Sequence, residues 1–257
     1  MLFRSANGST SASWTTAASA EILAIYRGGF TVRAKADASP VTEADEAAER
    51  ILLPRLAALL TNVPVISEEA QCGPSALTSG GEQFWLVDPL DGTKEFVAHR
   101  DEFTVNVALI EAGRPVLGVV AAPAFGTIFT GSGTGTAKGG ALGEPLKPIA
   151  ARPVPPEGAT VLISRSHENS RRVAEYLADV RVAKREMIGS SLKFCRIAEG
   201  TGDLYPRFGP TSEWDTAAGH AVLEAAGGSV TTLDGRPLRY GKERFLNSGF
   251  IARGRPS

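Results

Sequence analysis

Residues with metal-binding and phosphate-binding potential gather in one short stretch, residues 85–93, which reads WLVDPLDGT. The apolar run at residues 84–87 predicts a buried strand, because it is short, aromatic and β-branched. Pro89 keeps Asp88 extended at the strand end, and Asp91 follows three positions later. Gly92 and Thr93 come next, where free backbone N–H groups can bind an anion. The stretch therefore predicts a cation site beside an anion site, although the same residues would also suit a type I turn.

Two more carboxylates stand where the chain is expected to pass from one element to another. Glu68 follows a short strand predicted at residues 63–66, and Asp215 begins a helix predicted at residues 215–226. Alone, Glu68 would be a solvated loop charge and Asp215 a helix N-cap. Together with Asp88 and Asp91 they offer four carboxylates, the hard oxygen ligands that Mg²⁺ prefers. The set predicts metal-assisted phosphate chemistry.

Composition excludes several other classes of protein. The 257-residue chain is 43% apolar and 21% charged, with a net charge of −1 and no basic run, which argues against a sequence-independent nucleic-acid surface. Cys72 and Cys195 have no zinc or C-x-x-C spacing, so we expect a reduced, cytoplasmic protein without structural disulfides. No window approaches the ~18 consecutive apolar residues of a membrane span.

The first half of the chain predicts helices followed by a run of strands. After a frayed, Ser/Thr-rich start, residues 17–26 predict a helix, and a second helix begins with Thr42 as N-cap and Asp45 in a capping box. The expected strands cover residues 63–66, 84–87, 103–110, 116–121 and 127–130, the last two pairing as a meander. The glycine-rich segment 131–143 contains no phosphate-binding motif, so it predicts a flexible hairpin tip.

The second half alternates strands and helices, which predicts an α/β lobe. Proline-rich residues 145–156 predict the connection between lobes. The expected division is an N-terminal α+β metal-binding domain with an antiparallel sheet at residues 1–150, and a C-terminal α/β substrate domain with a mixed sheet at residues 151–257.

The motifs together resemble the inositol monophosphatase family. The resemblance rests on DPLDGT at residues 88–93 with Trp85 before it, on Glu68-Glu69 upstream, and on WDTAAG at residues 214–219. Within the family, KADASPVTEAD at residues 35–45 and TKEF at residues 93–96 resemble the CysQ-type branch, the 3'(2'),5'-bisphosphate nucleotidases. GSSLKFC at residues 189–195 and DLYPR at residues 203–207 point the same way. The resemblance implies a two-lobed, layered αβαβα sugar-phosphatase-like fold.

The resemblance also implies roles for the acidic residues. Glu68, Asp88 and the Leu90 carbonyl would hold one Mg²⁺, and Asp88, Asp91 and Asp215 a second, with a third, weaker ion near Glu68. Two ions about 3.5–4 Å apart can stabilise both the attacking and the leaving oxygen of an in-line displacement. Glu68 and a Thr93–Asp45 pair would orient the attacking water.

Substrate contacts are implied on both sides of the site. The backbone of Gly92 and Thr93 would bind the reacting phosphate, and Asp215 would face the leaving oxygen. Candidates for a second phosphate and an adenine come from the C-terminal lobe: Ser164, His167, Ser190, Lys193 and Arg207.

The implied activity is Mg²⁺-dependent hydrolysis of the 3'-phosphate of 3'-phosphoadenosine 5'-phosphate to AMP and phosphate, with the 5'-phosphosulfate as a further substrate. The expected partner is thus a small phosphorylated nucleotide, and the sequence does not give the oligomeric state. Inositol-phosphate or fructose-1,6-bisphosphate phosphatase activity on the same metal core is the alternative. A non-catalytic nucleotide-binding relative is a third, which the complete set of acidic residues disfavours.

Overall fold

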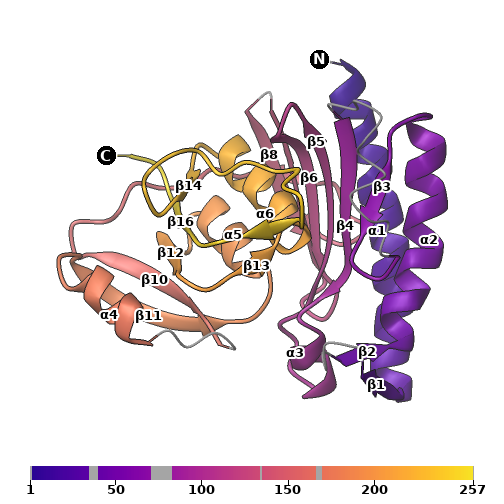
Figure 1. Ribbon diagram of the computed structural model, residues 1–257, viewed down its shortest axis with the longest axis horizontal. Helices are drawn as coiled ribbons and strands as arrows, with labels where there is room; N and C mark the ends of the chain where they lie inside the picture. Colours follow the sequence, from indigo (N-terminus) through magenta and orange to yellow (C-terminus); the bar gives the residue numbers. More distant parts are fainter. Residues whose placement is uncertain (1, 35–39, 71–82, 134, 166–169, 257) are drawn as a thin grey trace.

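The computed structural model describes residues 2–34, 40–70, 83–133, 135–165 and 170–256. These residues form five layers in the order helices, sheet, helices, sheet, helix (Figure 1). The helical layers are α1 (Leu2–Gly28) with α2 (Glu43–Leu59), then α5 (Leu192–Ala198) with α6 (Trp214–Ala225), and finally α4 (Ser170–Leu177). The predicted αβαβα architecture is confirmed.

The first sheet has seven strands in chain order, β3 to β9. Only β3 and β4 pair in parallel, and the remaining pairs are antiparallel, as predicted for the N-terminal sheet. The strands are β3 (Val65–Ser67), β4 (Gln83–Asp91), β5 (Thr104–Glu111), β6 (Arg114–Ala122), β7 (Thr127–Ser132), β8 (Thr136–Ala141) and β9 (Lys147–Pro148).

Strand β5 shows how this sheet is buried on both faces. Val105 and Val107 pack in a core shared with α1 and α2, whereas Ala108 and Ile110 pack in a core shared with α5 and α6. The alternation of Phe103, Val105, Val107 and Leu109 in the sequence predicts the first buried face but not the burial of the second. A sheet covered by helices on both sides carries apolar residues on both, so residues 105–110 are apolar apart from Asn106.

The second sheet has five strands in the order β11-β10-β12-β16-β14. They are β10 (Ala159–Ser164), β11 (Val182–Ile188), β12 (Leu204–Arg207), β14 (Ser229–Thr232) and β16 (Phe250–Arg253). Strands β10, β11 and β12 run parallel, and β16 is antiparallel to both β12 and β14. The predicted mixed sheet is confirmed.

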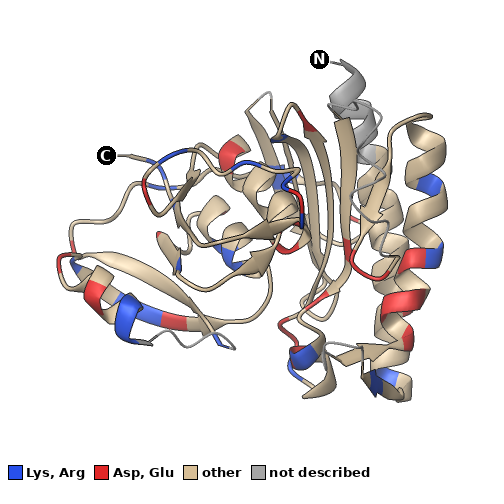
Figure 2. Cartoon of the chain, viewed as in Figure 1, with Lys and Arg blue, Asp and Glu red and all other residues tan. Residues whose placement is uncertain are grey.

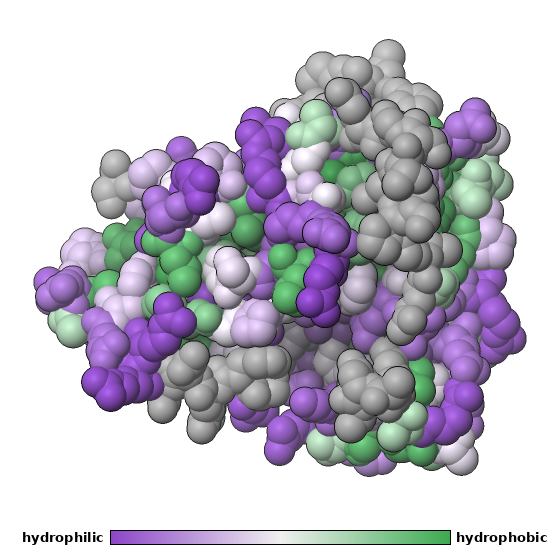
Figure 3. Space-filling model, viewed as in Figure 1, coloured by the Kyte–Doolittle hydropathy of each residue, from purple (hydrophilic) through white to green (hydrophobic). Residues whose placement is uncertain are grey.

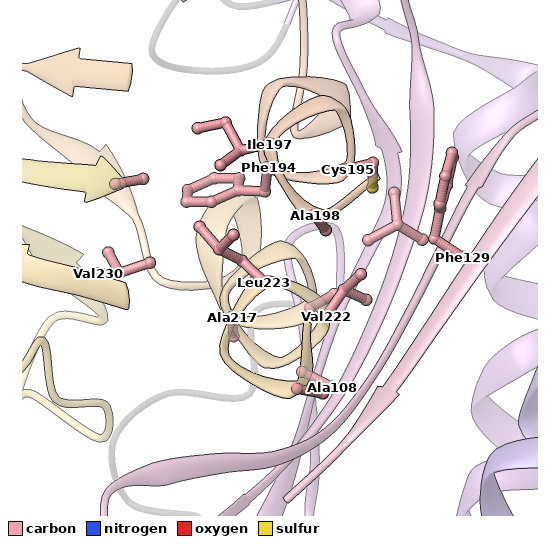
Figure 4. Packing of buried hydrophobic residues seen from close by; sticks show 14 of the residues in the cluster. Ala108, Phe129, Phe194, Cys195, Ile197, Ala198, Ala217, Val222, Leu223 and Val230 are labelled. Carbon is pink, nitrogen blue, oxygen red and sulfur yellow. The ribbon is translucent and has the colours of Figure 1, made fainter. Parts of the chain in front are cut away.

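Helices α5 and α6 fill the space between the two sheets. Figure 4 shows Phe194 and Ile197 of α5 beside Leu223 of α6, with Phe129 of the first sheet on one side and Val230 of the second on the other. Because one apolar cluster spans both sheets, the two halves share a core. The division into domains at residue 150 remains a prediction.

Helix α1 is longer than the sequence suggested. It begins at Leu2, whereas we expected a frayed segment up to residue 16. Hydroxyl groups of Thr15, Thr16 and Ser19 donate to carbonyls one turn earlier, which satisfies these polar side chains within the helix. Ser11, Thr15 and Ser19 are buried, so their small size lets the helix lie close to the sheet.

The glycine-rich segment is not the flexible hairpin tip that we expected. Most of it belongs to strands β7 and β8, which pair from Thr127 to Ala141. A Cβ on Gly131 would lie 2.5 Å from the Cα of Val222, and one on Gly118 would lie 2.3 Å from the carbonyl oxygen of Ala218. These glycines therefore let α6 approach the sheet closely, a demand that composition alone does not reveal.

Several short elements were not predicted. The two-residue strands β13 (Thr211–Ser212) and β15 (Leu246–Asn247) pair beside the start of α6. Strand β1 (Val32–Ala34) pairs with β2 (Pro40–Thr42). Helix α3 (Thr93–Val97) follows β4 and begins at Thr93, where the sequence allows either a helix or a turn to start. The sequence also predicts loops at residues 35–40 and 71–82; Pro40 belongs to β2, and the rest of both segments lies outside the described residues.

The surface carries both signs of charge. Basic and acidic residues alternate along β11 and α4, for example in the ion pairs Lys184–Glu186 and Arg171–Glu175 (Figure 2). On the face in Figure 3, apolar side chains form small patches between hydrophilic ones. No helix in the described part of the chain is both long and apolar enough to cross a membrane.

Candidate active site

A cavity of about 190 Å³ collects most of the residues singled out from the sequence. It lies where the end of β4, the start of α3, the loop before α5 and the start of α6 meet. The cavity is lined by eleven of the thirteen predicted site residues: Glu68, Asp88, Leu90, Asp91, Gly92, Thr93, Ser164, Ser190, Lys193, Arg207 and Asp215. Asp45 does not line the cavity, and His167 lies outside the described residues.

The end of β4 supplies the first two carboxylates. Asp88 and Asp91 flank a break in the pairing of β4 with β5, which occurs where Pro89 interrupts the strand. Asp88 is 1% exposed, and its Oδ1 accepts a hydrogen bond from the Leu90 backbone N–H at 3.1 Å. The proline thus turns the chain so that both carboxylates face the cavity.

Asp91 connects the two halves of the molecule. Its Oδ2 accepts from Asn106 of β5 at 3.3 Å and from the Ser191 backbone N–H at 2.5 Å. The Ser191 hydroxyl in turn donates to the Asn106 side-chain oxygen at 2.7 Å. Neither Asn106 nor Ser191 was predicted. Asn106 could have been noticed as the one polar side chain within the apolar run at residues 105–110.

Asp215 approaches the cavity from the opposite side. It is the second residue of α6, and the N-cap is Glu213. The Asp215 Oδ2 accepts from the Thr211 hydroxyl and from the Ser212 N–H. Strand β13 therefore fixes this carboxylate, and the alternative N-cap role is wrong because Glu213 holds that position.

Asp45 performs the helix-capping role predicted for it. Thr42 is the N-cap of α2, and the Asp45 Oδ2 accepts from both the Thr42 backbone N–H and its hydroxyl, at 2.8 and 2.9 Å. The Thr93 hydroxyl instead donates to the Leu90 carbonyl at 3.1 Å. Each side chain is thus engaged locally, and the structure shows no hydrogen bond between Thr93 and Asp45. Catalytic roles for the two remain predictions.

The carboxylates raise one another's pKa. Burial, followed by the charges of Glu68, Asp91 and Asp215, raises the pKa of Asp88 well above its usual range. Burial and the charge of Asp91 raise the pKa of Asp215 to about 7. Burial, with the nearby Glu69 and Glu68, raises the pKa of Asp45 to about 6. A cluster of this kind lacks positive charge, which a bound cation would supply.

Lys193 is buried at 2% exposure, with its ammonium facing the loop before α5. Its Nζ donates to the carbonyls of Ile188 and Ser190, at 3.0 and 2.6 Å, and lies 4.9 Å from the centre of the Tyr205 ring. Ser190 has a left-handed backbone with φ of 48°, which is costly for a residue with a side chain. Lys193 therefore holds this loop in addition to lining the cavity.

Arg207 lies at the end of β12. It donates to the Pro210 carbonyl at 2.8 Å and to the Tyr205 hydroxyl at 3.4 Å. Its Nε is buried without a hydrogen-bond partner among the described residues. Arg207 thus retains an unused donor in the wall of the cavity.

An ion pair joins the two halves at the edge of the cavity. Glu102, before β5, accepts two hydrogen bonds from Arg165, at 3.1 and 2.8 Å, and one from the Gly189 N–H at 2.7 Å. Arg165 also donates to the Met187 carbonyl. Arg165 belongs to the SRSH motif at residues 164–167, which the sequence marks as a candidate for substrate contacts, but the structure pairs it with Glu102.

The donor chemistry of the cavity fits a hard divalent cation. Within the described chain, the hydrogen bonds to Asp88, Asp91 and Asp215 all reach one oxygen of each carboxylate, Oδ1 of Asp88 and Oδ2 of the other two. The second oxygen of each remains for another ligand. As placed, no three acidic, histidine or cysteine side chains among the described residues stand close enough to enclose an ion. In the structure each carboxylate accepts from a local donor instead.

Comparisons with known proteins agree with this geometry. A sequence profile of the inositol monophosphatase family matches residues 8–254. The chain is 47% identical over 235 residues to the 3'(2'),5'-bisphosphate nucleotidase CysQ of Escherichia coli K12, covering 89% of this chain and 92% of that protein. It is 47% identical over 237 residues to the Salmonella typhimurium protein of the same name, with the same coverage, 89% and 92%.

The fold agrees as well. The crystal structure of CysQ from Bacteroides thetaiotaomicron, a bacterial member of the inositol monophosphatase family, superposes with a TM-score of 0.84 at 33% identity and covers 100% of both chains. On its sequence, its five-layered fold and the acidic cavity between its sheets, the chain belongs to the inositol monophosphatase family.

Proposed function

We propose that this protein is a Mg²⁺-dependent phosphomonoesterase that hydrolyses the 3'-phosphate of 3'-phosphoadenosine 5'-phosphate, giving AMP and phosphate. The observation that carries the proposal is that one cavity of the described chain combines the carboxylates of Glu68, Asp88, Asp91 and Asp215 with the cations Lys193 and Arg207. The names of relatives that are 47% identical support the choice of a bisphosphate nucleotide.

The carboxylates are the residues that we assign to the metal. Glu68, Asp88 and the Leu90 carbonyl would hold one Mg²⁺, and Asp88, Asp91 and Asp215 a second, with a third, weaker ion facing Glu68. When bound, the ions would acidify the attacking water and stabilise the charge that develops on phosphorus and on the leaving oxygen. Burial of the carboxylates supports this assignment, because water screens charges weakly there.

The chain's own residues would position the reacting groups. The backbone N–H groups of Gly92 and Thr93 bind the 3'-phosphate, and Glu68 orients the water. The water oxygen bonds to phosphorus as the bond from phosphorus to the 3'-oxygen breaks, and a proton passes to that oxygen. Positioning and charge stabilisation supply most of the rate.

The basic side of the cavity would bind the rest of the nucleotide. Arg207 offers its unpartnered Nε to the 5'-phosphate, and Ser164, Ser190 and Lys193 complete the wall. We assign His167 to the same subsite on its motif alone. The 5'-phosphosulfate analogue fits the same assignment, since it keeps both the 3'-phosphate and a 5'-anion.

A phosphate-release assay tests the proposal. Purified protein with Mg²⁺ is given 3'-phosphoadenosine 5'-phosphate, inositol 1-phosphate and fructose 1,6-bisphosphate in parallel. We expect the nucleotide to have the highest kcat/KM. A higher kcat/KM on either sugar phosphate would replace the proposed substrate, and Mg²⁺ binding without turnover of any of the three would indicate a non-catalytic relative.

A further inference from the structure

Glu95 is a buried carboxylate of the cavity that the mechanism above does not use. It lies on α3, is 5% exposed and lines the cavity beside Thr93 and Ser190. Among the described residues, none donates a hydrogen bond or offers an ion pair to its carboxylate. Its carboxylate oxygens are not fully enclosed by protein, so they remain open to the cavity, where a donor from a ligand can reach them.

Neighbouring residues hold Glu95 in place. A Cβ on Gly189 would lie 2.8 Å from the Glu95 Cγ, so the absent side chain at position 189 makes room for the glutamate stem. The nearby cation Arg165 is already engaged with Glu102 and with the Met187 carbonyl. Glu95 is also close enough to Asp91 for its charge to raise the pKa of that metal-ligand candidate.

The chemistry of the missing donor follows from these neighbours. A phosphate oxygen cannot serve, because phosphate and carboxylate are both negative. The group must therefore be a neutral or cationic donor, and it must lie near the reacting phosphate, since Glu95 lines the same cavity as Gly92 and Thr93 and its charge reaches Asp91. In a ribose 3'-phosphate, the donor nearest to the phosphate is the hydroxyl on the adjacent carbon. A 2'-phosphate isomer has the same arrangement, with a free 3'-hydroxyl beside it.

We propose that Glu95 accepts a hydrogen bond from the substrate hydroxyl adjacent to the scissile phosphate, and so selects phosphate esters of vicinal diols. The inference rests on the proposed function of the cavity and extends it to the sugar. It makes Glu95 a specificity-determining residue, separate from the groups that bind the phosphates.

The test compares two substrates and three proteins. The substrates are adenosine 3',5'-bisphosphate and its 2'-deoxy analogue, and the proteins are the wild type, Glu95→Ala and Glu95→Gln. A buried hydrogen bond to a charged group predicts that the wild type favours the ribonucleotide by about 10- to 100-fold in kcat/KM. The ratio should fall to within about threefold of unity in Glu95→Ala. Glu95→Gln should keep part of it, because the amide oxygen still accepts.

An unchanged ratio in Glu95→Ala would overturn the inference, as would equal losses on both substrates. A variant that instead changes selection between adenine and hypoxanthine bisphosphates would also overturn it, by assigning Glu95 to the base. Glu243→Ala, at an exposed position outside the cavity, is the matched control and should keep the wild-type ratio. If the wild type hydrolysed inositol 1-phosphate but not the nucleotide, the proposed function would fail. The same ratio measured with vicinal deoxy-inositol phosphate would still decide the role of Glu95.

Discussion

Buried carboxylates dominate the cavity at the scale of single residues, and they favour function over stability. Asp88 is 1% exposed, and burial together with neighbouring carboxylates raises its pKa. A carboxyl group whose pKa is raised in the folded state stabilises the fold only when protonated. At neutral pH its charge therefore opposes folding, a cost typical of binding sites before their ligand is present.

Replacing Asp88 by Asn should separate these two effects. We expect the metal-free variant to be more stable by about 1 kcal/mol or more at pH 7, because a repelled buried charge is lost. Phosphate release should fall at least about 100-fold, since a shared ligand is weakened. Urea unfolding in EDTA and turnover at saturating Mg²⁺ measure the two quantities. Near-wild-type turnover would contradict the bridging role of Asp88.

Lys193 and Arg207 should respond differently to removal, although both line the cavity. The Lys193 ammonium holds the carbonyls of Ile188 and Ser190, so Lys193→Ala should disturb the loop and raise KM for every substrate. The Arg207 Nε has no partner in the described chain, so Arg207→Ala should raise KM about tenfold or more for a bisphosphate nucleotide and little for inositol 1-phosphate. Equal changes in KM for both substrates in Arg207→Ala would contradict the assignment of Arg207 to the 5'-phosphate.

At the scale of elements, the sequence predicted the features that depend on neighbouring residues, such as helix caps and strands. The Thr42–Asp45 capping box and the strand at residues 84–87 are confirmed because each depends on residues a few positions apart, although β4 continues past Pro89 to Asp91. The contacts that complete the site could not be predicted in this way. Asp91 meets the backbone of Ser191, 100 residues away, and only the packing of α5 between the sheets brings the two together.

Glycine marks the clearest failure of sequence interpretation. Six glycines in residues 131–143 suggested a mobile tip, but Gly131 lies in a strand against the backbone of α6. Whether a glycine provides backbone flexibility or allows close packing depends on the helix that packs against it, and the local sequence does not contain that helix. The prediction of a frayed segment before residue 17 was wrong for a related reason. The buried Thr15 and Ser19 hydroxyls of α1 form hydrogen bonds within the helix.

Substitution at two glycines of adjacent strands tests this interpretation. A Cβ at Gly131 would approach the Val222 Cα to 2.5 Å, whereas one at Gly140 would lie 3.4 Å from the end of the Leu146 side chain. Gly131→Ala should destabilise the protein by about 2–3 kcal/mol through overpacking. Gly140→Ala, the matched control, should change the free energy of unfolding by less than about 1 kcal/mol. Similar losses from the two substitutions would show that space beside α6 is not the constraint.

At the scale of the whole molecule, buried titratable side chains make the free energy of unfolding depend on pH in two opposing ways. Asp45 and Asp215 have pKa values raised to about 6 and about 7, so their contributions weaken the fold as pH rises from about 4 toward neutrality. His220 acts in the opposite direction. It is buried in α6, its Nδ1 lies 2.9 Å from the Tyr240 hydroxyl, and burial with the charge of Arg114 lowers its pKa to about 3.

His220 should make the protein sensitive to acid between pH 6.5 and pH 3. In this window the unfolded chain binds a proton at this residue and the folded chain does not, so the free energy of unfolding falls as pH falls. The loss attributable to His220 should reach about 2 kcal/mol at pH 5.

Because the carboxylates oppose this trend, the informative quantity is the difference in the free energy of unfolding between the wild type and His220→Gln, which keeps a hydrogen-bonding group near Tyr240. Urea unfolding of both proteins from pH 7 to pH 5 should show the stability difference shifting by that amount in favour of the variant. His99→Gln, at an exposed position, is the control, and parallel curves for the wild type and His220→Gln would mean that the buried histidine is protonated in the folded protein.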